Sequence, residues 1–155
     1  AASANAVADD AEELRYTVAV VSDAAQGRAI LKESYQSAIE KLEQSNLSGI
    51  RGFNAANNLC VAYLKVGEKD AATEACQIAV ARIEKIIATR PAARKRSYYD
   101  DYYATLLAMA LSNLGVTYAA NDDHEQARDA FAAAIDTDSG ASAPAVNMAR
   151  LDKEA

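Results

Sequence analysis

A repeated six-residue pattern is the feature that most constrains the fold of this chain. Residues 58–63 read Asn-Leu-Cys-Val-Ala-Tyr, and residues 113–118 read Asn-Leu-Gly-Val-Thr-Tyr. After each tyrosine, the same spacing leads to an alanine, a larger apolar residue and a second alanine. Leucine and tyrosine four positions apart lie on one face of a helix. The pattern therefore predicts two helix-turn-helix units, each of which needs a neighbour to cover its apolar face.

The residues between the two halves of each unit are typical of turns. Residues 66–70 and 121–124 are rich in Gly, Asn, Asp and Lys. The chain of 155 residues contains only 6 Gly and 2 Pro, so breakers are few elsewhere. Abundant alanine favours helix and lets neighbouring helices approach closely. We therefore expect an all-α chain.

These residues resemble the tetratricopeptide-repeat (TPR) family, whose repeat of about 34 residues reads Leu-Gly-x2-Tyr and then Ala-x3-Phe. The match is nearly complete from Leu114 to Ala134 and weaker in the unit around Tyr63, where cysteines replace the glycine and the aromatic residue. A partial copy lies upstream, with Ala38 one repeat length before Ala72. The resemblance implies a TPR-like antiparallel helix-hairpin solenoid, with two full repeats, a degenerate N-terminal repeat and a short C-terminal cap.

One domain is expected from the length of the chain. Residues 1–14 are predicted to be a flexible N-terminal segment, and residues 15–155 a single TPR-like helical domain. Its repeats are expected at about 19–52, 53–88 and 97–138, with a capping helix at 145–153. Residues 15–21 are prone to β-structure but have no visible partner strand, so both an extended and a helical form stay open.

The spacing between the two repeat tyrosines, Tyr63 and Tyr118, is longer than one repeat. One interpretation lengthens both flanking helices into a protruding hairpin tipped by residues 89–96. The other places a separate inserted helix in residues 88–97. The sequence leaves both open.

Four tyrosines begin the second long helix of this region. Exposed tyrosine beside arginine is typical of binding surfaces, and the nearby basic run is Arg90 with residues 94–96. The alternative is that all four pack on Ile83, Ile86, Ile87 and the N-terminal segment. The four are Tyr98, Tyr99, Tyr102 and Tyr103.

The two cysteines, Cys60 and Cys76, are expected on facing helices of one hairpin. A disulfide between them would close a loop of about 15 residues and contribute about 3 kcal/mol of stability. The alternative is a pair of small, buried, reduced side chains.

No pattern in the chain indicates an enzyme. His124 is the sole histidine and falls in a turn among acidic residues, without the spacing of a zinc or calcium site. Adjacent carboxylates at residues 9–10, 100–101 and 122–123 point apart if helical. No nucleophile motif or phosphate-binding glycine loop is present. We expect no catalytic residue, no metal and no cofactor.

The net charge and the composition of the first residues limit the partners and the location that we expect for this chain. A net charge of −6 repels phosphate backbones, so nucleic acid is not expected. Membrane insertion is not expected either, because no apolar run approaches about 20 residues. The small residues at 1–8 resemble the tail of a cleaved export signal. A periplasmic or secreted location is therefore expected, with the cytoplasm as the alternative.

The TPR resemblance implies that the first helices of successive repeats line a concave face that holds a peptide. That face lacks Lys and Arg, which excludes the family's grip on C-terminal carboxylates of heat-shock chaperones. The expected role is an adaptor, of a bacterial cell envelope, for an extended or helical peptide or partner protein with apolar anchors. The alternative is a structural homodimer that self-associates through the helix of residues 98–103. The lining residues are Asn54, Asn57, Val61, Leu64, Ser112, Val116 and Ala119.

Overall fold

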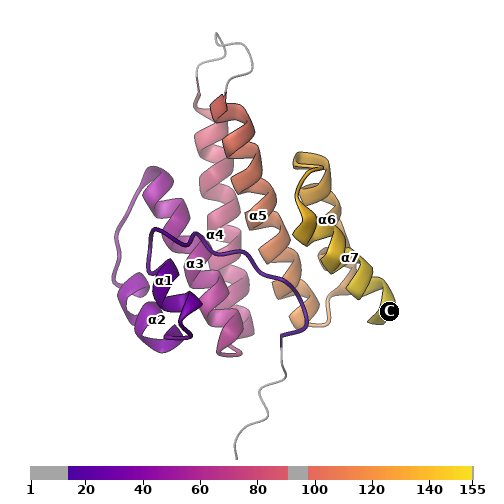
Figure 1. Cartoon of the computed structure of the whole chain (residues 1–155), viewed down its shortest axis with the longest axis horizontal. Helices are drawn as coiled ribbons and strands as arrows, with labels where there is room; N and C mark the ends of the chain where they lie inside the picture. The colour runs from indigo at the N-terminus through magenta and orange to yellow at the C-terminus, as the bar shows by residue number, and fades with distance from the viewer. Residues whose placement is uncertain (1–13, 91–97, 155) are drawn as a thin grey trace, which may run out of the picture.

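The computed structural model describes residues 14–90 and 98–154, and Figure 1 shows their arrangement. Within these ranges the chain forms seven helices and no strand, which confirms the all-α expectation. The helices are α1 Gly27–Leu31, α2 Tyr35–Glu43, α3 Gly49–Lys65, α4 Lys69–Ala88, α5 Tyr98–Ala120, α6 His124–Thr137 and α7 Ser142–Glu154.

The two predicted units fold as the hairpins α3–α4 and α5–α6, and their first helices end in the same way. In α3 the N–H of Glu68 donates to the carbonyl of Tyr63 at 2.9 Å, and in α5 the N–H of Asp123 donates to the carbonyl of Tyr118 at 2.9 Å. The residue before each donor has positive φ, as this type of helix end requires. The repeated tyrosines therefore mark equivalent positions of two equivalent turns.

The core of the α5–α6 hairpin depends on one contact between a small and a large residue. Phe131 is fully buried in α6 and lies against Gly115 in α5. A Cβ added to Gly115 would lie 2.5 Å from Cε1 of Phe131. The glycine is therefore needed for the close approach of the two helices.

Cys60 of α3 and Cys76 of α4 lie at disulfide distance, with their sulfurs 1.98 Å and their Cα atoms 5.2 Å apart. Both side chains are fully buried in the same apolar cluster. The bond ties the two helices of the first hairpin together.

We expect reduction of this pair to lower the free energy of unfolding by about 3 kcal/mol, because the cross-link restricts the unfolded chain. Urea denaturation with and without reductant measures the change. Cys60→Ala/Cys76→Ala is the control, since reductant should not alter its unfolding. Two titratable thiols in air-kept unfolded protein would contradict the expectation.

Helices α4 and α5 extend side by side beyond the other helices (Figure 1). Their bounds, Lys69–Ala88 and Tyr98–Ala120, agree with the interpretation in which both flanking helices are lengthened. Residues 91–97 lie outside the described residues, and so does the predicted basic run at 94–96. The expectation that no apolar stretch reaches membrane-spanning length is wrong. By length and composition Tyr99–Ala120 is long and apolar enough to cross a membrane, and 56% of its apolar stretch is buried inside the protein.

The helices near the two ends of the domain differ in extent from those expected. The first repeat is expected at about 19–52, and within this range α1 has only five residues, while residues 14–26 before it are not helical. The C-terminal helix α7 begins at Ser142 and ends at Glu154, so it is longer than the predicted cap at 145–153.

Candidate functional site

Residues 14–21, called here the resident segment, cross one face of the helical array without forming a helix (Figure 1). The segment leads into α1 through residues 22–26. Its backbone is bound by side chains of α3, α5 and α7, as the following contacts show. The β-prone stretch is therefore extended, which decides between the two forms left open by the sequence.

Asparagine side chains bind this backbone at alternate residues. On α3, Oδ1 of Asn58 accepts from the N–H of Val21 at 2.8 Å, and its Nδ2 donates to the carbonyl of the same residue at 2.9 Å. On α5, Asn113 binds Ala19 in the same two-fold way, with both distances 2.9 Å.

The third helix completes the series. On α7, Asn147 accepts from the N–H of Thr17 and donates to its carbonyl, both at 2.8 Å. We call Asn58, Asn113 and Asn147 the asparagine ladder. All three side chains are fully buried.

The ladder works because an amide side chain offers one carbonyl acceptor and an N–H donor, as a backbone peptide does. In an extended chain, the N–H and C=O groups of every second residue point to the same side. Residues 17, 19 and 21 therefore meet three successive asparagines, as they would meet a neighbouring strand. The ladder therefore takes the place of a partner strand.

A second layer of hydrogen bonds orients the ladder. Nδ2 of Asn113 donates to Oδ1 of Asn57 at 3.0 Å, and Nδ2 of Asn57 donates to the carbonyl of Ala19 at 3.1 Å. Nδ2 of Asn58 also donates to the carbonyls of Ala24 and Ala25. These bonds set the direction of the amide groups, so the ladder is a connected network of buried polar groups.

The side chains between the ladder-bound residues pack into apolar surface. Tyr16 is buried and stacks on Phe131, with ring centroids 6.3 Å apart. Val18 packs against the buried clusters that contain Val116 and Val61, and Val20 packs against the latter cluster. The backbone of the resident segment is thus bound along one edge by the asparagines, and its alternate side chains pack on the core.

Helix α7 binds the first residues of the resident segment most closely. The hydroxyl of Tyr16 donates to Glu154 at 2.5 Å, and Arg15 forms an ion pair with the same carboxylate at 3.8 Å. The guanidinium of Arg150 donates to the carbonyl of Arg15. These contacts add charge-assisted bonds at one end of the ladder.

Tyr16 of the resident segment and Tyr63 of α3 both have raised pKa values. Burial, and then the hydrogen bond to Glu43, raises the pKa of Tyr63 to about 12. Burial, and then the hydrogen bond to Glu154, raises the pKa of Tyr16 as well. In both cases the folded protein holds the phenol proton more tightly than the unfolded chain does.

We therefore expect the free energy of unfolding to fall as the pH rises from about 10 toward 12. The contribution is fully present below the pKa of unfolded tyrosine and is lost through the folded pKa. Urea denaturation at about pH 9 and about pH 11 measures it. The variant Tyr63→Phe should lose less stability over this range than the wild type. Equal losses would contradict the role of this tyrosine.

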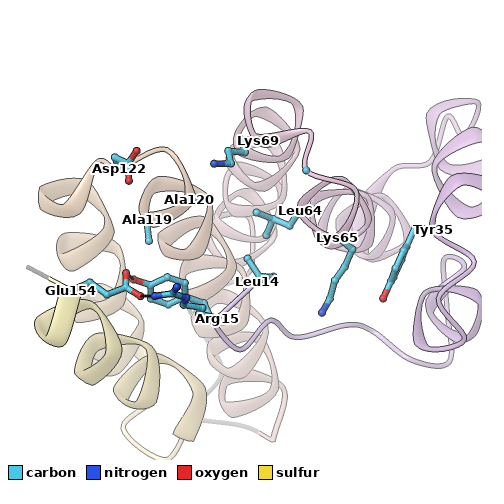
Figure 2. Close-up of a pocket in the computed structure, with 12 residues that line it drawn as sticks. Leu14, Arg15, Tyr35, Leu64, Lys65, Lys69, Ala119, Ala120, Asp122 and Glu154 are labelled. Carbon is cyan, nitrogen blue, oxygen red and sulfur yellow. Dashed lines mark hydrogen bonds and ion pairs between the residues drawn. The ribbon is translucent and has the colours of Figure 1, made fainter. Parts of the chain in front are cut away.

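A pocket of about 410 Å³ lies at the Leu14 end of the resident segment. Figure 2 shows Arg15 beside Glu154 on one side, Tyr35 near Lys65 on the other, and Leu14 between them. The lining mixes both signs of charge with apolar side chains. Such a lining can bind a peptide but presents no convergent acid–base set.

The predicted lining residues lie at or beside the resident segment. Val61, Leu64, Val116 and Ala119 belong to the buried clusters on which its side chains pack. Ser112 and Asn57 are buried and bond to the ladder, whereas Asn54 is partly exposed. Their role in partner binding stays a prediction.

The predicted tyrosine group divides between surface and core. Tyr99 and Tyr102 are 57% and 41% exposed, whereas Tyr103 packs on the cluster containing Ile83 and lies 4.9 Å from the guanidinium of Arg90. The side chain of Tyr98 lies outside the described residues. Tyr99 and Tyr103 lie one helical turn apart on α5, yet Tyr99 is exposed while Tyr103 packs on the core.

The prediction missed the ladder as a functional set, although the signal was present. Asn58 and Asn113 hold the same position in the repeated pattern, and Asn147 follows Asn113 by one repeat length of 34 residues. Asn147 of α7 therefore presents to the segment the same side-chain amide that Asn58 and Asn113 present from α3 and α5.

Within residues 14–90 and 98–154, no group of three or more His, Cys, Asp or Glu is placed to hold a metal ion. His124 begins α6 and is partly exposed. Comparisons of the chain with protein-family models, curated proteins and solved structures found no match.

Proposed function

We propose that this chain is an interaction adaptor of the tetratricopeptide-repeat type, which binds an extended segment of another protein on α3, α5 and α7. The asparagine ladder carries the proposal. Bonds to backbone groups accept any extended chain with N–H and C=O at alternate residues, while neighbouring pockets select its side chains. The equivalent turns after Tyr63 and Tyr118 support the repeat type. The proposal involves no catalysis, cofactor or nucleic acid.

An exported location, periplasmic or secreted, is part of the proposal. Its support is the pair Cys60–Cys76 at disulfide distance, because disulfides persist in oxidising compartments and are rare in the cytosol.

A display library of random peptides of roughly twelve residues tests the binding role. It is panned against the full-length wild type and against Thr17→Pro, which removes one N–H that the ladder binds. Selected peptides should bind about tenfold more weakly to proteins that also carry Asn113→Ala. The exposed Asn46→Ala is the matched control and should bind normally. Peptides that bind regardless of Asn113, or no binders at all, would refute the proposal.

A second candidate, self-association through the helix of residues 98–103, is favoured by the exposure of Tyr99, Tyr102 and Ile87 on the protruding hairpin. Exposed tyrosines at the end of a hairpin are suited to the centre of an interface. Sedimentation equilibrium of the wild type should then show a dimer that Tyr99→Glu/Tyr102→Glu dissociates. A wild type that stays monomeric at all concentrations would eliminate this candidate.

A further inference from the structure

The resident segment is bound as a ligand would be bound. Within the described part of the chain, none of its residues forms a backbone–backbone hydrogen bond. Its backbone bonds go instead to side chains of α3, α5 and α7, which lie 37, 94 and 130 residues away in sequence. The backbone hydrogen bonds of the helices that hold it are internal to each helix, so the helices need no backbone bond from the segment.

The connection between the resident segment and α1 has an unfavourable backbone conformation. Ala25 and Gln26 have φ values of 46° and 61°, in the left-handed region that side chains other than glycine disfavour. Nδ2 of Asn58, which binds Val21, also donates to the carbonyls of Ala24 and Ala25, so the ladder holds this connection together with the segment. The cost of holding this connection weakens the bound state relative to an unlinked strand with the same contacts.

We propose that residues 14–21 are an internal ligand that closes the ladder, and that a matching extended segment of another protein replaces it. This inference rests on the proposed function and names its ligand class. Because the segment is joined to α1 by only five residues, its effective concentration at the ladder is high. A partner displaces it only by fitting the ladder and its pockets well. The bound segment therefore excludes peptides that would bind the ladder weakly.

The pockets define the side chains of that partner. The first pocket, on Phe131, takes a tyrosine, because its hydroxyl reaches Glu154 at 2.5 Å. The same carboxylate pairs with a preceding cation, as it does with Arg15. The next two alternate positions take aliphatic side chains, as Val18 and Val20 show.

The ladder adds a constraint on the backbone of the partner. Each residue bound by an asparagine must offer an N–H, so proline is excluded at the three positions that correspond to Thr17, Ala19 and Val21. The ligand class is thus an extended peptide of the form cation-Tyr-x-aliphatic-x-aliphatic-x without proline at x. A helical peptide cannot bind the three asparagines in this way, because its backbone N–H and C=O groups are already paired within the helix.

Fluorescence anisotropy with a labelled synthetic peptide that copies residues 14–23 tests this inference. The receptors are the full-length wild type and two variants with a weakened resident segment, Tyr16→Ser and Thr17→Pro, each checked for folding by circular dichroism. We expect both variants to bind the peptide at least about tenfold more tightly than the wild type does. A second peptide with its tyrosine replaced by serine should bind the variants about tenfold more weakly.

Hydrogen exchange on the wild type gives a measurement that needs no variant. Excess unlabelled peptide should speed the exchange of the backbone N–H groups of residues 17, 19 and 21, because displacement exposes them to water. Unchanged exchange at saturating peptide would overturn the inference. So would equal affinity of the wild type and the variants, since the segment would then not close the ladder.

The outcomes separate this inference from the proposed function. If library peptides bind through Asn113 but the copied peptide does not, only the ligand class is wrong. If no peptide binds any variant, both proposals fail. A wild-type dimer that exchanges residues 14–21 between copies would overturn replacement by another protein, because the partner would then be a second copy of this chain.

Discussion

Replacement of Phe131 by alanine is expected to lower the free energy of unfolding by about 3–5 kcal/mol. The ring is fully buried, contacts Gly115 of α5 and stacks under Tyr16, so its removal leaves a cavity at the meeting point of α5, α6 and the resident segment. Urea denaturation followed by circular dichroism measures the loss. The melting temperature should fall by on the order of 10 °C for a chain of this size.

A double-mutant cycle with Gly115→Ala shows whether the contact itself is responsible. In the wild type the added methyl group clashes with the ring, and overpacking of this kind costs about 1–3 kcal/mol. In the Phe131→Ala background the clash is absent, and alanine should stabilise α5 by about 0.5–1 kcal/mol over glycine. Additive effects of the two substitutions would contradict the packing described here.

The variant Asn113→Ala is expected to lose about 3 kcal/mol, because it leaves two polar groups without their partner and removes one of the two bonds to a third. The N–H of Ala19 and Oδ1 of Asn57 lose their partner, whereas the carbonyl of Ala19 keeps its bond from Nδ2 of Asn57. Truncation removes the middle rung of the ladder, so the resident segment should detach before the helices unfold. Chemical denaturation gives the total loss of stability.

Hydrogen exchange locates this loss within the molecule. In Asn113→Ala the N–H groups of residues 17–21 should exchange far faster than those of α3 and α5, which retain their internal bonds. The control Asn46→Ala removes an exposed asparagine and should change stability by less than about 0.5 kcal/mol. Equal exchange of the segment and the helices in Asn113→Ala would mean that the segment is an integral part of the fold.

The helical hairpins could be predicted because their signal is local. Leu59 and Tyr63 lie one helical turn apart, and the turn glycine Gly67 follows at once, so the period of the pattern and its break identify the hairpin. The same hairpin places Cys60 and Cys76 on facing helices. Contacts between neighbours along the chain need only the geometry of one helix and one turn.

The binding partner of residues 14–21 could not be predicted in this way. Their β-prone composition was visible, but nothing near them in sequence could pair with their backbone. The N–H of Thr17 finds its acceptor at Asn147, 130 residues away. The exposure of Tyr99 and Tyr102 likewise depended on which helices pack beside α5.

The amino-acid sequence by itself determined that the chain is helical, where its hairpins turn and which cysteines meet, because each of these depends on spacings within one or two helices. The tertiary structure alone decided that Asn58, Asn113 and Asn147 align on one face and that the resident segment lies along them. The physical reason is that an asparagine looks the same in a sequence whether its amide faces water or a backbone. Only the stacking of α3, α5 and α7 buries the three amides in register with an extended chain.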